Sequence, residues 1–166
     1  MAKKSESTAG GGTPATLALA QARIEFVAHT YDHDPRAASF GMEAAEKIGI
    51  DPERVFKTLL ADVDGELVVG VVPVAGSLDL RALAAAARGK RAVMADPMLA
   101  QRRTGYVVGG ISPIGQKAAH RTFVDSSAIL CESMLVSGGR RGFDVELAPD
   151  DLLAVTGASY ADIGRP

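Results

Sequence analysis

The stretch VFKTLLADVDGELVVGVVPV, residues 55–74, constrains the fold more than any other part of the sequence. Two apolar runs flank Asp64 and Gly65, the pair that a two-residue hairpin turn prefers because both positions require a positive φ. The composition of both runs is typical of strands. The segment is therefore predicted to form a β-hairpin.

Helices are expected where a capping residue precedes an apolar pattern and a stop signal follows it. The expected helices are ATLALAQAR after Thr13 and Pro14, SFGMEAAEKIG capped by Ser39, SLDLRALAAAARG capped by Ser77, DPMLAQRRTG capped by Asp96, and PDDLLAVTG. Further strands are expected at EFVAHTY, YVVGGI, TFVD, SMLVSG and FDVELA. Because the strands cluster without strict βαβ alternation, the predicted class is α+β, with a mixed, curled or barrel-like sheet and helices outside.

The length of 166 residues suits one domain. Residues 1–12, rich in Ser, Gly and Lys, are expected to be a disordered tail, and residues 13–166 a single domain. The lone Cys131 cannot form an internal disulfide, and no Cys and His spacing is typical of zinc sites. The opening residues lack the apolar core of a signal peptide, and no later run suits a membrane span. A cytoplasmic protein without membrane contact is expected.

Charge is distributed unevenly along the chain. Residues 81–141 hold ten Lys and Arg against three Asp and Glu, whereas the formal charge of the whole chain is −2. One interpretation is a solvated basic surface, and the other is a partner rich in phosphate.

Lys57 is the only charged residue on one face of its predicted strand. Side chains alternate along a strand, which places Val55, Lys57, Leu59, Ala61 and Val63 together. An unpaired ammonium on an apolar face costs several kcal/mol unless it reaches solvent, a partner or a ligand. Lys57 is therefore either a lysine that extends to the sheet edge or a residue that lines a pocket.

The segment HTYDHDP places His29 and His33 four residues apart beside carboxylates. In a helix this spacing would suit a metal, but Pro35 and the neighbouring residues favour an extended chain, in which the rings lie about 13 Å apart. No metal site is predicted. Tyr31 and His33 either line a cleft or are ordinary half-buried strand residues.

Two glycine-rich segments could shape a site. GGISP, from Gly109 to Pro113, lacks the Lys-Ser/Thr pair of a nucleotide-binding P-loop, but its glycines allow backbone N–H groups to converge on an anion or a polarised carbonyl. SGGRRGFD brings Ser137 and Asp144 close in sequence. Each segment could equally be a structural turn, and Cys131, without a histidine partner, is interpreted as structural.

These motifs together resemble the YbaK/EbsC family of aminoacyl-tRNA deacylases, which are similar to the editing domain of bacterial prolyl-tRNA synthetases. The resemblance extends from Thr13 to Ile163 and depends on TPA, HTYDHDP, FKTLL, VPVAGSLDL, MADPMLAQRRTGYVVGGISPIGQK and VSGGRRGFDVEL. The YbaK branch, whose members act on cysteine mischarged on proline tRNA, is the most similar.

The resemblance implies roles for individual residues. Lys57 would hold the terminal adenosine and the ester, while Gly109 and Gly110 would be catalytic backbone donors to the oxyanion. The positions expected to bind substrate are Tyr31, His33, Thr58, Ile111, Ser112, Pro113, Ser137 and Asp144. No cofactor and no metal are implied.

The implied function is trans-editing hydrolysis of cysteinyl-tRNA(Pro), with the thiol of the substrate attacking its own ester. Water attack, an alanyl-tRNA(Pro) deacylase and a non-catalytic tRNA- or synthetase-binding module are the alternatives. The implied partners are the 3′ acceptor end of mischarged proline tRNA and, as a second candidate, prolyl-tRNA synthetase. DNA and membranes are not implied as partners.

Overall fold

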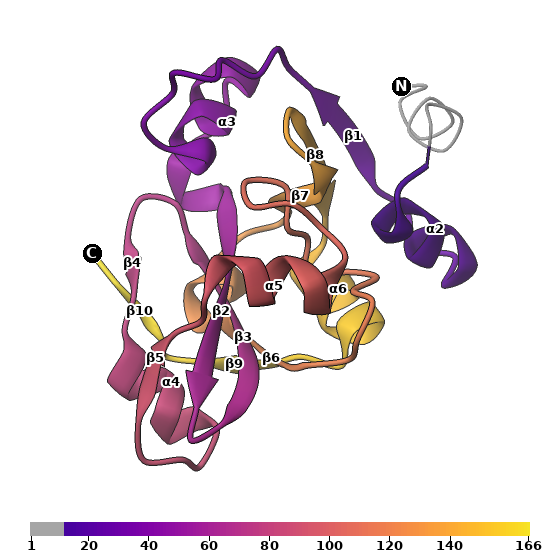
Figure 1. Ribbon diagram of the computed structural model, residues 1–166. Helices are drawn as coiled ribbons and strands as arrows, with labels where there is room; N and C mark the ends of the chain where they lie inside the picture. Colours follow the sequence, from indigo (N-terminus) through magenta and orange to yellow (C-terminus); the bar gives the residue numbers. More distant parts are fainter. Residues whose placement is uncertain (1–11) are drawn as a thin grey trace.

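A mixed five-stranded sheet forms the centre of the computed structural model, which describes residues 12–166 (Figure 1). Its strands, in spatial order, are β5 (Ala92–Met94), β2 (Phe56–Val63), β3 (Glu66–Pro73), β6 (Arg121–Asp125) and β9 (Ser159–Ala161). The pairs β5–β2 and β2–β3 are antiparallel, whereas β3–β6 and β6–β9 are parallel.

Two smaller antiparallel sheets accompany the central one. The first has the order β1 (Val27–Thr30), β8 (Phe143–Leu147) and β7 (Met134–Arg140), and the second pairs β10 (Gly164–Arg165) with β4 (Ser77–Leu78). A parallel bridge between Val55 and Leu135 joins the start of β2 to β7. The three-stranded sheet therefore lies beside the first residues of β2.

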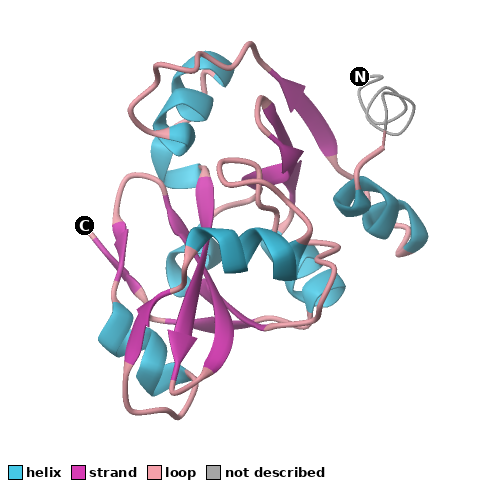
Figure 2. Cartoon of the chain, viewed as in Figure 1, coloured by secondary structure: helices cyan, strands magenta, loops and turns pink. Residues whose placement is uncertain are grey.

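Helices lie outside the strands, as Figure 2 shows. They are α2 (Pro14–Gln21), α3 (Phe40–Ile48), α4 (Leu80–Ala86), α5 (Pro97–Thr104) and α6 (Pro149–Thr156), with short 3₁₀ turns η1 (Pro52–Arg54) and η2 (Ser126–Leu130). Thr13, Ser39 and Asp96 cap their helices through side-chain oxygens, as predicted. The α+β class with a mixed sheet is confirmed.

The predicted hairpin is formed by β2 and β3. Asp64 and Gly65 have φ values of 52° and 95°, so both occupy the left-handed region that such a turn requires. The register runs from Val63 opposite Glu66 to Phe56 opposite Pro73.

Two local predictions were wrong. Ser77 belongs to β4, and Asp79 caps α4 instead, because the Asp79 side chain accepts a hydrogen bond from the N–H of Ala82. The segment YVVGGI is a turn rather than a strand, since Gly109 has a φ of 90°. Strands β4, β5, β9 and β10 were not predicted. Of the predicted tail, residues 1–11 lie outside the described residues.

Both faces of β2 pack against apolar clusters. Phe56 and Leu60 belong to the main apolar cluster, whereas Leu59, Ala61 and Val63 pack in a second cluster that includes Leu83 of α4. Lys57, Thr58 and Leu59 remain partly exposed. Within residues 12–166, none of the helices has the length and apolar content that crossing a bilayer requires.

Candidate functional site at the open edge of β2

Strand β2 has one edge that is only partly paired. Strand β5 pairs with Ala61, Asp62 and Val63, and the last contact on this edge is the Ala95 N–H donating to the Leu60 carbonyl at 3.0 Å. Backbone groups of every second residue face the same edge of a strand. The N–H and C=O of Thr58 therefore face this open edge, beyond the end of β5.

A cavity of about 400 Å³ lies along this edge. We call it the strand-edge pocket. Its lining comprises residues 56–60 of β2, Tyr31, Ala38, Ser39, Phe40, Gly41, Ala44 and Val55, then Met94, Ala95, Pro97 and Ala100, and finally Val108, Gly109, Ile111, Ser137 and Asp144. The pocket therefore lies between β2, the start of α3, the segment from β5 to α5, and the ends of β7 and β8.

Lys57 is half-buried in the lining of this pocket. No carboxylate among residues 12–166 lies within ion-pair distance of its ammonium. Burial lowers the pKa of Lys57 below its ordinary value, since the charged form loses hydration without gaining a partner. Lys57 is a cation available to a ligand.

Asp144 is the second uncommitted charge. Its side chain is 6% exposed and lines the same pocket, and no hydrogen bond to its carboxyl group is found within the described chain. Burial raises the pKa of Asp144 to about 7. The carboxyl group therefore exchanges its proton near neutral pH.

Hydroxyl groups complete the polar lining, and that of Ser39 is already engaged as the cap of α3. The Thr58 Oγ1 atom is buried and has no hydrogen-bond partner. Ser137 lies directly across from Asp144 in the β7–β8 register. Burial, followed by the nearby charges of Asp144 and Glu43, raises the pKa of Tyr31 to about 12, so its phenol stays protonated and can donate a hydrogen bond.

Gly109 is where the glycine-rich loop reaches the pocket. Its φ of 90° is accessible to glycine, and a Cβ atom at this position would lie 2.6 Å from the ring of Phe40. The Gly109 N–H has no acceptor within the described part of the chain. The positive φ and the nearby Phe40 ring thus both require glycine at position 109, whose own N–H is a free donor.

The other residues of the predicted Gly-x-x-x-Pro motif differ in position. Ile111 lines the pocket, whereas Gly110, Ser112 and Pro113 do not. The Gly110 N–H donates to the Val107 carbonyl at 2.8 Å, and a Cβ atom at Gly110 would lie 2.7 Å from the Cα of Arg140. Gly110 therefore closes a turn against the β7–β8 connection, and its N–H is already engaged.

His33 lies outside the pocket lining. Its Nδ1 contacts Glu43 Oε1 at 2.8 Å, and its ring stacks on Phe40 with 5.5 Å between centroids. Glu43 is buried, which alone would raise its pKa, but hydrogen bonds from the Asp34 N–H, His33 and Lys47 lower the pKa to about 2. This ionised carboxylate ties the HTYDHDP segment to α3.

His29 contacts a different carboxylate, Glu146, at 2.8 Å. Among residues 12–166, no group of three His, Cys, Asp or Glu side chains has the proximity that a metal ion needs.

Sequence reasoning missed the pocket residues contributed by helices. Phe40 and Ala44 come from α3, and Pro97 and Ala100 from α5. Apolar residues of this kind are indistinguishable in sequence from ordinary core residues. The helix caps at Ser39 and Asp96 located both helices but gave no indication that they face a cavity.

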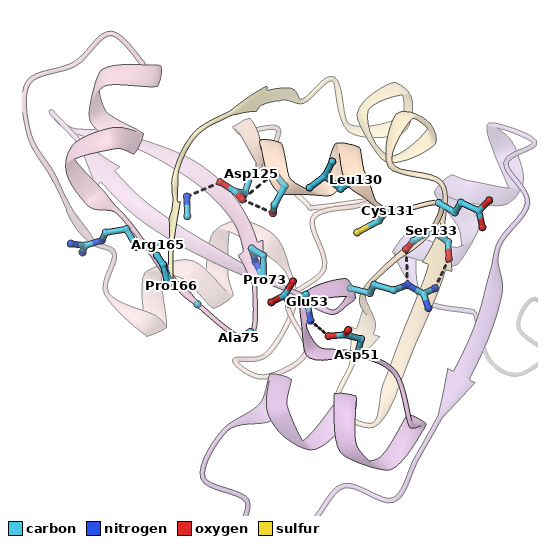
Figure 3. Close-up of a pocket in the computed structure, with 15 residues that line it drawn as sticks. Asp51, Glu53, Pro73, Ala75, Asp125, Leu130, Cys131, Ser133, Arg165 and Pro166 are labelled. Carbon is cyan, nitrogen blue, oxygen red and sulfur yellow. Dashed lines mark hydrogen bonds between the residues drawn. The ribbon is translucent and has the colours of Figure 1, made fainter.

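A larger cleft of about 720 Å³ provides a contrast. We call it the C-terminal cleft. Figure 3 shows its lining, which comprises Asp51, Glu53, Arg54, Pro73, Ala75, Gly76, Asp125, Ser127, Leu130, Cys131, Glu132, Ser133, Gly164, Arg165 and Pro166. No histidine is among these residues.

The less exposed polar groups of the C-terminal cleft bind one another. Asp125 accepts hydrogen bonds from the N–H groups of Gly164 and Ile163 at 2.7 and 3.0 Å and also from Ser127. Arg54 donates to Ser133 Oγ at 2.6 Å and also to Glu146, outside the lining, at 2.8 Å. The pKa of the Cys131 thiol is raised, mainly by burial, so the thiolate is a minor form at neutral pH.

Comparison with known proteins identifies the family and the fold of this chain. The model of the aminoacyl-tRNA editing domain family matches residues 34–155, which include Lys57, the glycine-rich loop and Asp144. EbsC of Enterococcus faecalis, named as a candidate Cys-tRNA(Pro)/Cys-tRNA(Cys) deacylase, is 39% identical over 121 residues, covering 72% of this chain and 73% of EbsC. The chain therefore belongs to the YbaK/EbsC family of aminoacyl-tRNA editing domains.

Solved structures show the same fold. One described as a candidate trans-editing enzyme for prolyl-tRNA synthetase has a TM-score of 0.80 at 22% identity, covering 92% of this chain and 96% of the other. A second, described as a hypothetical protein, has a TM-score of 0.82, also at 22% identity, and covers 92% and 100% of the two chains. A further relative, the uncharacterized YwhH of Bacillus subtilis, is 26% identical and covers 66% of this chain and 70% of YwhH.

Proposed function

We propose that this protein is a trans-editing aminoacyl-tRNA deacylase that cleaves the ester of cysteinyl-tRNA(Pro). One observation carries the proposal: an unpaired ammonium, an unpaired carboxyl group and an unpaired hydroxyl, those of Lys57, Asp144 and Thr58, meet in one pocket lined mainly by apolar groups. Buried polar groups without partners are rare in proteins and need an explanation. A bound aminoacyl ester would supply the missing partners.

The charges of the pocket match those of an aminoacylated tRNA end. The ammonium of Lys57 would bind the terminal nucleotide and the ester oxygens, while the carboxylate of Asp144 would pair with the α-ammonium of the amino acid. Thr58 would donate to the substrate through its hydroxyl, and its backbone groups at the open edge of β2 would bind along the aminoacyl group. Tyr31, Ser137 and Ile111 would limit the size of the side chain that fits.

The backbone at Gly109 would stabilise the reaction. An aminoacyl ester is already activated, so cleavage needs mainly orientation and a donor for the oxygen that becomes negatively charged. Of the two expected donors, Gly109 has a free N–H, whereas that of Gly110 is engaged with Val107. We therefore assign the oxyanion donor to Gly109 and a supporting role to Gly110, Ser112 and Pro113. His33 would act indirectly by fixing the loop that carries Tyr31.

The substrate would supply its own nucleophile. The sulfur of the cysteinyl group attacks the carbonyl carbon, the bond to the 3′ oxygen of the ribose breaks, and that oxygen receives the proton that the thiol gives up. The products are free tRNA and a cysteine thiolactone, which water then opens to cysteine. Neither step consumes an oxidant, a reductant or a nucleophile from the protein.

An alanyl ester is the second candidate substrate, because a small apolar pocket discriminates weakly between side chains that differ by a single group. An alanyl group has no thiol, so its release would require attack by water. A binding module without catalysis is the third candidate, and the free charges of the strand-edge pocket argue against it.

The test is the rate of ester loss from proline tRNA charged with cysteine, alanine, serine or proline. We expect cysteine to be released fastest, because only its side chain can attack the ester. Fastest release of alanine would replace the thiol mechanism by attack of water. Binding of the charged tRNA without loss of any ester would favour the binding module.

A further inference from the structure

A row of residues in contact with one another borders the strand-edge pocket, and Val108 takes part in it through its backbone groups. The guanidinium carbon of Arg141 lies 5.2 Å from the ring centroid of Phe40, and Arg141 Nε donates to the Val108 carbonyl at 2.9 Å. The Val108 N–H donates to Gln101 Oε1 at 2.9 Å, and Gln101 Nε2 lies 3.8 Å from Met98 Sδ. We call these five residues the rim strip. It links α3, the β7–β8 turn, the glycine-rich loop and α5.

Exposed apolar side chains belong to the rim strip or lie next to it in sequence or in the pocket wall. Met98 is 60% exposed, Val107 50%, Met94 49% and Phe40 37%. Phe40 and Met94 also line the pocket, so the apolar surface is continuous with the pocket wall. Large apolar side chains that are exposed to solvent around a pocket are typical of a contact surface.

The charge around this surface is positive. Residues 97–124 contain neither Asp nor Glu, and Arg102 and Arg103 are exposed at the end of α5. Arg140 and Arg141 are exposed on the β7–β8 turn. In Figure 1, α5 lies across the front of the central sheet, and the chain passes from its C-cap Gly105 directly into the glycine-rich loop. The surface therefore combines apolar contact groups with cations, as surfaces that bind single-stranded nucleic acid do.

We infer that the rim strip binds the unpaired nucleotides that precede the terminal adenosine of tRNA. This inference rests on the proposed function, which places the terminal aminoacyl nucleotide in the pocket. The preceding bases would lie on Met98, Val107 and the guanidinium plane of Arg141, while the arginines contact the phosphates. Stacking on the Arg141 guanidinium and apolar contact with Met98 and Val107 involve the faces of the bases rather than their edges, so this binding would tolerate any base.

The experiment uses fluorescence anisotropy to measure binding of a labelled RNA hairpin that has an unpaired CCA 3′ end and carries no amino acid. Met98→Glu places a negative charge on the rim strip, and Ile129→Glu is its control, because Ile129 is equally exposed at 60% but lies on η2, beside the C-terminal cleft. We expect roughly tenfold weaker binding for Met98→Glu and no change for Ile129→Glu. A blunt-ended hairpin should bind wild type and Met98→Glu equally.

Each other outcome has a defined meaning. The inference is overturned if both variants lose RNA affinity equally or if Met98→Glu loses none. It is also overturned if the wild type does not prefer the hairpin with the unpaired end. Normal RNA binding by Met98→Glu together with lost binding to prolyl-tRNA synthetase would assign the rim strip to a protein partner instead. If no ester is cleaved but RNA binding depends on the unpaired end and on Met98, the inference about the rim strip is supported while the proposed function is wrong.

Discussion

Asp144 and Asp125 are two carboxylates with nearly the same exposure, 6% and 7%, in two different cavities. Asp125, in the C-terminal cleft, accepts hydrogen bonds from Ser127 and from two backbone N–H groups, and they lower its pKa although burial opposes them. Asp144, in the strand-edge pocket, lacks such donors, and burial raises its pKa to about 7. The same residue type, equally buried, is part of the scaffold in one cavity and available for binding in the other.

The comparison shows that cavity size is a poor guide to function. The C-terminal cleft is nearly twice as large, but its less exposed polar groups bind one another. The strand-edge pocket is smaller and contains groups that the protein leaves without partners. A buried polar group without a partner costs free energy and needs an explanation, and at Thr58 a bound ligand would provide one.

The largest expected effect concerns the cations of the two cavities. Lys57→Ala should lower the deacylation rate by at least roughly 100-fold, because a preorganised charge at the ester is lost. Arg165→Ala, in the C-terminal cleft, should change the rate by less than about twofold, because its side chain is 61% exposed. Rates of ester loss and melting curves of both variants give the measurement. A folded Lys57→Ala protein with the wild-type rate would remove Lys57 from the mechanism.

The second expected effect is that replacing Asp144 or Asp125 by asparagine changes the free energy of unfolding at pH 8 in opposite directions. Asp144 has a raised pKa, so it binds its proton more tightly when folded, and its stabilising contribution is lost as pH rises through about 7. Asp144→Asn should therefore exceed the wild type in free energy of unfolding at pH 8, by up to roughly 4 kcal/mol, and approach it near pH 4. Denaturant unfolding at both pH values provides the measurement.

Asp125→Asn should behave in the opposite way. Its pKa is lowered in the folded state, so its contribution is present above the unfolded pKa near 4 and is lost as pH falls through the folded value. The variant should be less stable than the wild type at pH 8, by roughly 2 kcal/mol, because buried N–H groups lose a charged acceptor. If the free energy of unfolding at pH 8 changes in the same direction in both variants, the distinction between the two carboxylates is wrong.

The smallest expected effect is that of Cys131→Ser. The Cys131 thiol lines the C-terminal cleft and stays protonated at neutral pH, so it is a poor nucleophile. The deacylation rate should stay within about twofold of the wild type if the substrate provides the thiol. A folded but inactive variant would instead indicate a nucleophile from the protein, and would give the C-terminal cleft the catalytic role.

The local structure could be predicted because it depends on short-range chemistry. Asp64 and Gly65 define a turn whatever surrounds them, and Ser39 and Asp96 cap helices through bonds within their own first turns. The strand predicted across Gly109 was wrong because a neighbouring ring and a left-handed backbone decide that position. Parallel pairing of β3 with β6 is also non-local, and no adjacent signal specifies it.

The candidate site was partly predictable for the same reason. Lys57 was evident as one charge on an apolar strand face. The sequence could not distinguish Asp144 from Asp125, since the difference lies in N–H groups supplied by residues far along the chain. It also could not show that His33 would bind Glu43 instead of facing the pocket.

The shortness of β5 lowers the stability of the protein and leaves a sheet edge uncovered. Two more residues paired along β2 would add backbone hydrogen bonds worth about 1 kcal/mol each and would cover a sheet edge, the kind of surface through which chains aggregate. They would also fill the space beside Thr58. Selection for heat resistance alone would therefore favour closing this edge, and the resulting protein would be more stable but would have no opening beside Thr58.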